Sequence, residues 1–354
     1  MIRLIAGLAI ALAALASALS PSRAENLPDT IRFGGFGQGF GQPYGVAALA
    51  IAQVKGFIAD EFKGTPVKFT YQYFTGTGPA INEAFANDQL DFAQYGGLPN
   101  IIGKAAGLPT RILASYGLTT IFGIARAQAD IASVKDLRGK KVAVAKGTIL
   151  HWALLKALDS NGLSLRDISL IDLKSADQTA ALSAGTVDAV IGTSTQLVLV
   201  DRGVAKVFYS SKDLGLKTAG FGSIAVAEPF ERKYPEATQR VASALVRAAE
   251  WLSHDENHEE AFQIWIKSGV SYDSLRKEFE GVSWKDAFNP RVDTFFVSQY
   301  RDAVAFTKEQ KLIRADIDLS KWFAPEYVER AIAERKLTGF WKDRNAEGNV
   351  VVSQ

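Results

Sequence analysis

Glycine and hydroxyl residues recur in this sequence where strand-like runs give way to helix-like runs. Glycine lets a ligand approach the backbone closely, and the first N–H groups of a helix lack intrahelical partners and carry partial positive charge. An anion with several acceptor oxygens satisfies both conditions. Helix capping is the simpler explanation of any single turn of this kind. Their number favours a shared anion site, because five such turns follow predicted strands: Gly34 to Tyr44, Thr75 to Gly78, Tyr95 to Gly97, Lys146 to Thr148 and Gly192 to Thr195.

Charged and aromatic residues lie in or beside several of these turns. Lys146 could add a positive charge, although a lysine in a loop is usually solvated. His151 lies in the first turn of the following helix, where a neutral imidazole is favoured, either as a ligand contact or packed in the core. Four aromatic residues near the turns could wall a pocket or fill the core: Phe36, Phe40, Tyr44 and Tyr95.

Catalytic and metal-binding patterns are missing from the sequence. His254 and His258 lie four residues apart, but a metal site needs a further ligand, and their polar run is typical of a solvated surface. The sequence has no P-loop or nucleophile elbow, and Gln42 stands where a dinucleotide-binding loop needs its third glycine. The absence of cysteine excludes thiol nucleophiles, thiolate metal sites and disulfides. We therefore expect a binding protein without cofactor or metal, not an enzyme.

The turns depend on an alternation of strands and helices. Between residues 31 and 209 apolar strand-like runs alternate with helix-like segments, and the clearest strand, Val142 to Ala145, leads into a helix from Ile149 to Asn161. This βαβ rhythm predicts an α/β protein with parallel sheets, whose strand ends bring the turns to one edge. After Pro235 helices dominate, and we expect them at 236–253, 259–267, 272–279, 292–307 and 325–335.

Length and charge narrow the class of protein. The chain has 354 residues, with 40 Lys and Arg against 38 Asp and Glu. Without Arg3 and Arg23, which lie in a removable N-terminal segment, the balance is 38 against 38, too neutral for a nucleic-acid binder. Hydrophobic residues make up 47% and charged residues 22%, the usual mix of a folded soluble protein, and the length is sufficient for two domains.

The N-terminal segment has the three parts of a secretory signal peptide. An arginine precedes an uncharged Ala- and Leu-rich stretch from Leu4 to Leu19, and small residues at Ser22 and Ala24 predict cleavage before Glu25. The stretch is shorter than the roughly 20 apolar residues of a transmembrane helix, which argues against an anchor. We expect residues 1–24 to be removed and the mature chain to be free in an exported compartment.

Several segments along the chain together match the pattern of one protein family. They include Phe74 to Pro79, Leu90 to Phe92, Gly96 to Pro99, Leu137 to Thr148 with His151, Gly185 to Ala189, and Lys311 to Ile313 with Trp322. With these segments the chain resembles the periplasmic substrate-binding proteins of ABC importers for nitrate, sulfonates and taurine, and most of all the aliphatic sulfonate branch. The resemblance covers almost the whole mature chain, and the block from Lys146 to His151 is its most specific part.

The resemblance implies a type II periplasmic-binding-protein fold, with two open sheets in two lobes and a cleft between them. The implied units are lobe one at 25–118 and 222–354, lobe two at 119–221, and a hinge near 116–120 and 219–223. A ligand would bind between the helix starts at Gly97 and Thr148, one from each lobe, and would favour the closed form. The candidate ligand-binding residues are Gln42, Tyr44, Thr75, Gly97, Gly147, Thr148, His151, Thr193 and Gly222.

Two segments depart from the family's pattern. The loop from Gly34 to Tyr44 is longer and richer in glycine than the usual first loop. Gly192 to Gln196 stands where family members often carry an aromatic-acid-proline run. Small hydroxyl residues thus replace an aromatic wall, which indicates a larger or more polar ligand.

The sequence predicts the solute-binding component of an ABC importer. The expected partners are a small organic anion and a permease of the inner membrane, and the protein is expected to be a periplasmic monomer. A sulfonate is favoured because it stays ionised and offers three acceptor oxygens. Two alternatives stay open. One is a carrier of a pyrimidine-precursor or other heteroaromatic solute, for which Tyr44 and Tyr95 would supply stacking. The other is an enzyme related to pyrimidine-precursor synthases, against which the lack of cysteine argues, because such relatives use a Cys-rich motif.

Overall fold

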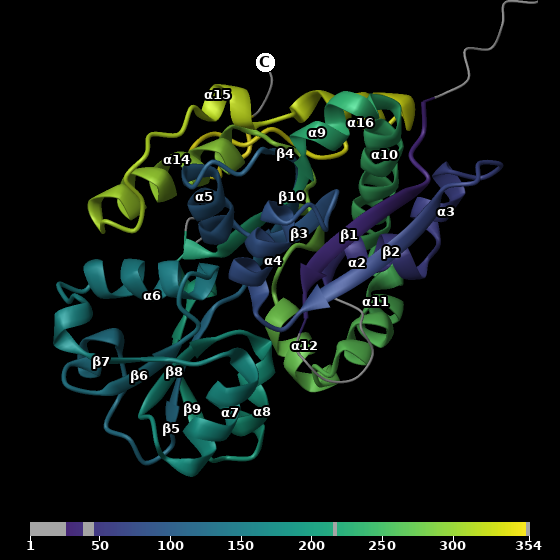
Figure 1. Ribbon diagram of the computed structural model, residues 1–354. Helices are drawn as coiled ribbons and strands as arrows, with labels where there is room; N and C mark the ends of the chain where they lie inside the picture. The colour runs from purple at the N-terminus through teal and green to yellow at the C-terminus, as the bar shows by residue number, and fades with distance from the viewer. Residues whose placement is uncertain (1–25, 38–45, 215–217, 352–354) are drawn as a thin grey trace, which may run out of the picture.

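The computed structural model describes residues 26–37, 46–214 and 218–351, and it contains two five-stranded sheets (Figure 1). The strand orders are β2-β1-β3-β10-β4 and β7-β6-β8-β5-β9. The first sheet consists of β1 (Thr30–Phe36), β2 (Lys68–Phe74), β3 (Phe92–Gly96), β4 (Thr110–Thr119) and β10 (Gly220–Ala227). The second consists of β5 (Phe122–Arg126), β6 (Lys141–Val144), β7 (Ser169–Asp172), β8 (Ala189–Gly192) and β9 (Ala205–Ser210). The predicted α/β fold with two open sheets is confirmed.

Each sheet is mixed, which corrects the prediction of parallel sheets. In the first sheet β1 pairs in parallel with β2 and β3, whereas β10 runs antiparallel to β3 and β4. In the second sheet β6 pairs in parallel with β7 and β8, whereas β5 runs antiparallel to β8 and β9. β5 and β10 are the strands by which the chain enters each sheet from the other one. Because no crossover helix of the same sheet precedes them, the rule that makes successive strands parallel does not apply.

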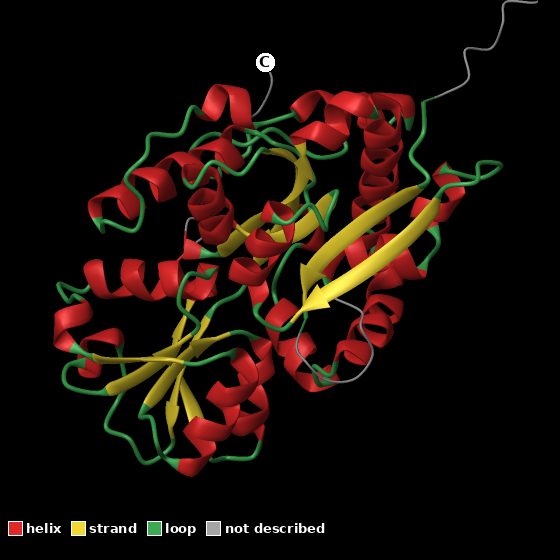
Figure 2. Ribbon diagram, viewed as in Figure 1, coloured by secondary structure: helices red, strands yellow, loops and turns green. Residues whose placement is uncertain are grey.

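Helices surround both sheets (Figure 2). In the first half of the chain they are α2 (Ala47–Val54), α3 (Phe57–Glu61), α4 (Thr77–Ala86), α5 (Gly97–Ala105), α6 (Ile149–Asp159), α7 (Ser175–Ala184) and α8 (Leu197–Asp201). They continue with α9 (Glu228–Lys233), α10 (Pro235–Leu252), α11 (His258–Trp265), α12 (Tyr272–Phe279), α13 (Trp284–Ala287), α14 (Thr294–Glu309), α15 (Leu319–Trp322) and α16 (Pro325–Glu334). Short 3-10 helices include η3 (Ser194–Gln196) and η4 (Ser211–Leu214). The five helices predicted after Pro235 are present within a few residues.

The apolar core continues from one lobe into the other through α6. This helix belongs to the second sheet, yet its residues share a buried cluster with α5, α14 and β10 of the first. The rings of Trp152 on α6 and Phe221 on β10 meet edge to face, with centroids 5.3 Å apart. Lys156 of the same helix places its Nζ 4.6 Å from the ring centroid of Phe306 on α14. The two lobes are therefore joined by packing on this side as well as by the chain.

The chain passes between the sheets twice among the described residues. It leaves the first sheet at Thr119 and enters the second at Phe122, then leaves at Ser210 and re-enters the first at Gly220. The first passage adjoins the predicted segment 116–120 and the second ends within 219–223, and the role of these segments as a hinge stays a prediction. The assignment of residues to two lobes that move relative to each other stays a prediction. It gives lobe one as 25–118 and 222–354, and lobe two as 119–221.

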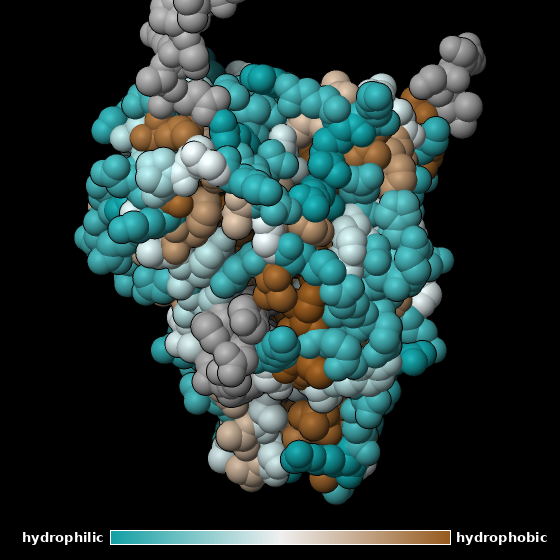
Figure 3. Space-filling model, turned by 90° about the vertical axis from the view of Figure 1, so that its right-hand side faces the viewer, coloured by the Kyte–Doolittle hydropathy of each residue, from teal (hydrophilic) through white to brown (hydrophobic). Residues whose placement is uncertain are grey.

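Among the described residues, no helix combines the length and apolar character that crossing a bilayer needs. On the face drawn in Figure 3 hydrophilic residues predominate, and hydrophobic residues gather mainly near its middle. The predicted signal peptide at 1–24 lies outside the described residues.

Candidate ligand-binding cleft

The starts of α4, α5 and α6 lie against one another at the boundary between the two sheets. A Cβ atom at Gly78 on α4 would lie only 2.2 Å from Cγ of Pro99 on α5. A Cβ atom at Gly96, just before α5, would lie 3.0 Å from Cβ of Ile149, the first residue of α6. Only glycine permits both approaches without displacement. Three helix N-termini, two from the first sheet and one from the second, therefore share one site.

The backbone N–H groups at these helix starts differ in how they are capped. Gly76 and Gly96 are the N-cap residues of α4 and α5, and glycine has no side chain that could cap a helix. Thr148 caps α6, where its hydroxyl accepts from the Leu150 N–H at 3.3 Å and donates to the Ala145 carbonyl at 2.7 Å. The uncapped N–H groups of α4 and α5 are the ones best placed to receive an anion.

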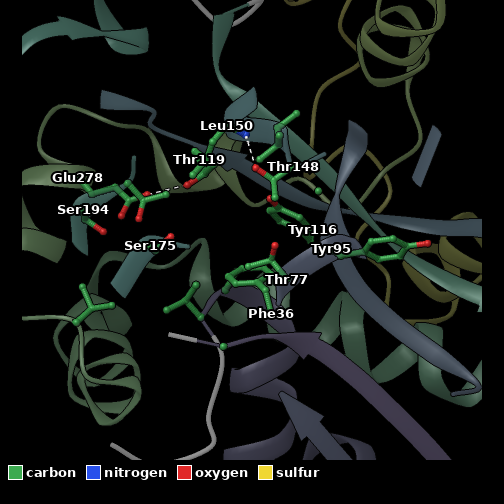
Figure 4. A pocket seen from close by; sticks show the side chains of 18 of the residues that line it. Phe36, Thr77, Tyr95, Tyr116, Thr119, Thr148, Leu150, Ser175, Ser194 and Glu278 are labelled. Carbon is green, nitrogen blue, oxygen red and sulfur yellow. Dashed lines mark hydrogen bonds between the residues drawn. The ribbon is translucent and has the colours of Figure 1, made fainter. Parts of the chain in front are cut away.

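A cleft of about 1070 Å³, including the part open to solvent, lies beside these helix starts. Its lining includes residues at the starts of helices from both lobes, namely Ala47, Thr77, Gly78, Gly96, Thr148, Ile149, Ser175, Thr193 and Ser194. Its apolar part includes Phe36, Val46, Tyr116, Trp265, Val270, Leu275, Phe279 and Phe288. Figure 4 shows Thr77 and Thr148 on one side of the space and Ser175 and Ser194 on another. The cleft thus suits a ligand with an anionic head and an apolar body.

Two lining residues have a left-handed backbone although they are not glycine. Ala47 begins α2 with φ 66° and Thr77 begins α4 with φ 54°. Such conformations cost of the order of 1–3 kcal/mol and are concentrated at functional sites. At both positions the strain lies at a helix start that faces the cleft.

One ionisable side chain was missed by the sequence analysis. Glu278 lies on α12, lines the cleft, and is only 7% exposed. Thr119 Oγ1 donates to its Oε1 at 2.8 Å, and the Ser194 hydroxyl donates to the same carboxyl. Burial raises the pKa of Glu278 above its ordinary value, and the two hydroxyls oppose that shift. Among the described lining residues it is the only acid, and no described lysine, arginine or histidine lines the cleft.

The tyrosines of the cleft are held by close backbone packing. Burial raises the pKa of both Tyr95 and Tyr116. A Cβ atom at Gly222 would lie 2.2 Å from the Tyr116 ring and 2.5 Å from the Tyr95 carbonyl oxygen. Gly222, a predicted contact, is not among the lining residues and instead makes room for Tyr116.

The predicted site residues fall into three groups. Thr148 and Thr193 line the cleft, whereas Gln42 and Tyr44 lie outside the described residues. The other five do not line it: Thr75, Gly97, Gly147, His151 and Gly222.

In two of these turns a neighbouring residue takes the predicted place. Thr75 is exposed, and Thr77 lines the cleft instead. Gly97 is buried against Phe221, because a Cβ there would lie 2.1 Å from that ring, and Gly96 lines the cleft. Both predicted turns reach the cleft, but which residue of each turn lines it depends on the exact backbone direction.

His151 is packed within its own turn. The Gly147 N–H approaches its Nδ1 at 3.4 Å, and its Nε2 has no hydrogen-bond partner among the described residues. Burial and the nearby Lys146 charge lower the pKa of His151, in agreement with the expected neutral imidazole. This histidine supports the start of α6 from inside rather than lining the cleft.

His254 and His258 do not share a helix face. α11 begins only at His258, and the imidazole of His258 stacks on Trp284 with ring centroids 3.7 Å apart. Within the described residues no group of three or more metal-ligating side chains occurs.

Comparison with known proteins identifies the family. Residues 44–258 match the family model described as NMT1/THI5 like. A putative aliphatic sulfonates-binding protein of Bacillus subtilis (strain 168) is 29% identical over 299 residues, 83% of this chain and 87% of the relative. A putative periplasmic sulfonate-binding protein of a sulfonate ABC transporter from Methylobacillus flagellatus KT has a similar crystal structure, with TM-score 0.79 and 29% identity over 91% of this chain and 99% of that one.

The fold is not confined to binding proteins. The desulfurization enzyme DszB superposes with TM-score 0.67 at 18% identity, over 87% of this chain and all of the enzyme, which shows the shared fold alone. The resemblance inferred from the sequence is confirmed: the chain belongs to the NMT1/THI5-like family of substrate-binding proteins.

Proposed function

We propose that this protein is the solute-binding component of an ABC importer and that it captures a small organic anion, a sulfonate in the first place. The observation that carries this proposal is the meeting of three helix N-termini at one cleft, where Gly78 touches α5 and Gly96 touches α6. The described lining has no basic side chain, so backbone N–H groups must supply the positive potential. A sulfonate offers three acceptor oxygens to three helix starts.

The names of similar proteins support the same ligand class. The relatives from Bacillus subtilis and Methylobacillus flagellatus are both described as sulfonate-binding, and the latter as part of an ABC transporter. The apolar residues of the cleft, among them Trp265 and Phe279, would hold the carbon part of such a ligand. Ligand capture by the helix starts of both lobes would favour the closed form, which a permease in the membrane would then read.

Titration calorimetry with alkanesulfonates and arylsulfonates tests the proposal. Binding at about micromolar affinity is expected, and the sulfonamide of the same carbon skeleton, which is neutral, should bind far more weakly. Heat with a neutral heteroaromatic compound and none with any organic anion would favour the heteroaromatic carrier instead. Turnover of a sulfonate or sulfinate by the protein alone would favour the enzyme alternative.

A proline substitution tests the backbone contribution of α6. Ile149→Pro removes one N–H at the first helical position, where proline is well tolerated, and Thr148 before it is already extended at φ −106° and ψ 171°. Loss of one hydrogen bond to a charged acceptor costs about 1.5–3 kcal/mol, so sulfonate affinity should fall about tenfold or more. The matched control is Ile149→Ala, which loses apolar volume but keeps the N–H, and which should weaken binding less. Equal weakening in both variants would count against an N–H contact.

A further inference from the structure

Helix α12 is fixed to the first lobe by its apolar side chains. Leu275 belongs to the buried core cluster of that lobe, which also contains Trp265 and Trp284. The ring of Phe279, the last residue of α12, has its centroid 5.5 Å from that of Trp265 and 4.6 Å from that of Trp284. In any rearrangement of the two lobes, α12 must therefore move with the first one.

Polar side chains of the same helix are bonded to the second lobe. Lys277 forms an ion pair with Asp201, the last residue of α8. The carboxyl of Glu278 accepts a hydrogen bond from the hydroxyl of Ser194, the first residue of η3. Figure 4 shows the side chains of Glu278 and Ser194 next to each other at one side of the cleft. Two adjacent residues of α12 thus reach across to the second lobe.

The same end of α12 is tied to the segments by which the chain passes between the sheets. At the first passage Thr119 Oγ1, at 2.8 Å, and the Thr120 N–H both donate to the carboxyl of Glu278. At the second, Nζ of Lys212 donates to two backbone carbonyls at the end of α12, at 2.7 and 3.0 Å. With three donors and the Lys212 charge nearby, the buried carboxyl is well satisfied and holds three segments together.

The two lobes also touch at α6, but that contact is mainly apolar. Trp152 and Phe221 belong to one buried cluster that spans both lobes, so separation at α6 would expose apolar surface to water. The hydrogen bonds and the ion pair of α12 can instead be exchanged for bonds to water at a small net cost. The lobes are therefore better able to separate at α12 than at α6, which contact different parts of the second lobe (Figure 1).

We propose that α12 is a latch: its bonds from Lys277 to Asp201 and from Glu278 to Ser194 hold the two lobes together and set the ratio of closed to open forms. The bonds to Thr119, Thr120 and Lys212 keep the end of the helix in place for these partners. The latch goes beyond the proposed function, because it acts whichever solute the cleft takes.

Distances between two spin labels test the latch on the mature protein. Because the chain has no cysteine, Asp273→Cys on α12 and Ala180→Cys on α7 supply two exposed labelling sites, one on each lobe. In this labelled protein Asp201→Lys places like charges together. The ratio of open to closed forms should rise about threefold to tenfold, seen as a population at longer distance. Adding Lys277→Asp restores an opposite pair and should restore the original distribution.

A second step and two controls make the test specific. Ser194→Ala added to Asp201→Lys removes the other bond of the latch and should raise the open population about tenfold further. Asp316→Lys is the matched control, because it reverses an exposed charge that pairs with Lys308 inside the first lobe, and the distances should not change.

A second label pair reports on the α6 contact. Asp159→Cys on α6 and Glu309→Cys on α14 supply exposed sites on the two lobes, and their distance should stay the same in the latch variants. Unchanged distances from α12 to α7 in Asp201→Lys with Ser194→Ala would overturn the latch. So would failure of Lys277→Asp to reverse the effect of Asp201→Lys, or an equal change at the α6 pair. These measurements need no solute, so a lack of sulfonate binding in calorimetry would count against the proposed function alone.

Discussion

Replacement of Gly78 by alanine tests whether close packing of α4 on α5 builds the anion site. The new Cβ would lie 2.2 Å from Cγ and 2.4 Å from Cβ of Pro99, whereas ordinary contact begins at 3.4 Å. The proline ring is rigid, so the two helix starts must separate by about 1 Å. A shift of that size takes an N–H···O bond of about 2.9 Å out of range.

The expected result is a large loss of affinity with a moderate loss of stability. One hydrogen bond to a charged acceptor is worth about 1.5–3 kcal/mol, so the Kd for a sulfonate should rise about tenfold to a hundredfold. Overpacking should lower the free energy of unfolding by about 1–3 kcal/mol. Calorimetry measures the first quantity and urea denaturation the second.

Gly103→Ala is the matched control within α5. Its Cβ would meet the ends of side chains, Oδ1 of Asn82 at 2.7 Å and Cδ1 of Leu108 at 2.9 Å, and the residue does not line the cleft. Some stability should be lost and the sulfonate affinity kept. The reasoning is refuted if Gly78→Ala loses stability as expected but binds sulfonates with wild-type affinity.

Two further predictions concern the start of α6. Thr148→Ala removes the capping hydroxyl and should lower the free energy of unfolding by about 1 kcal/mol. Sulfonate affinity should change less than in Ile149→Pro, because the hydroxyl already bonds to Ala145 and Leu150. Denaturation and calorimetry of both variants check these two expectations. The lowered pKa of His151 means that the unfolded chain binds a proton more readily than the folded protein, so stability should fall as the pH drops below about 6.5. In His151→Leu this pH dependence should be smaller, measured by urea denaturation between pH 5 and 8, and an unchanged slope would contradict the assignment to this histidine.

Capture of an anion by backbone N–H groups has a consequence for ligand choice. Helix N-termini act over a short range and do not depend on the protonation of a side chain. Glu278 is the only acid or base among the described lining residues, so under the proposed function selectivity between anions would depend mainly on the apolar surface around Trp265. The helix starts would then attract the anionic group, and the apolar end of the cleft would discriminate between anions.

Local features of the sequence determined the elements and the turns. Alternating apolar runs predicted most strands and the later helices. Burial of one face of an element makes apolar residues recur at a regular spacing, which is visible within a short stretch of sequence. The hydroxyl before α6 predicted an N-cap at Thr148, which the structure contains. The glycines at 76–78 and 96–97 predicted helix starts open to an anion, and both lie at the cleft.

Only the tertiary structure decided which residues meet. Glu278 and Trp265 lie at least 70 residues along the chain from the turns that line the same cleft. Within their own helices, the sequence shows them only as an ordinary polar position and an ordinary apolar position. The choice of Gly96 over Gly97 depends on a backbone direction that alternates from one residue to the next at the end of β3. The antiparallel direction of β5 and β10 follows from passage between lobes. Contacts between distant segments are fixed by the packing of whole helices and sheets, and no short stretch of sequence contains that information.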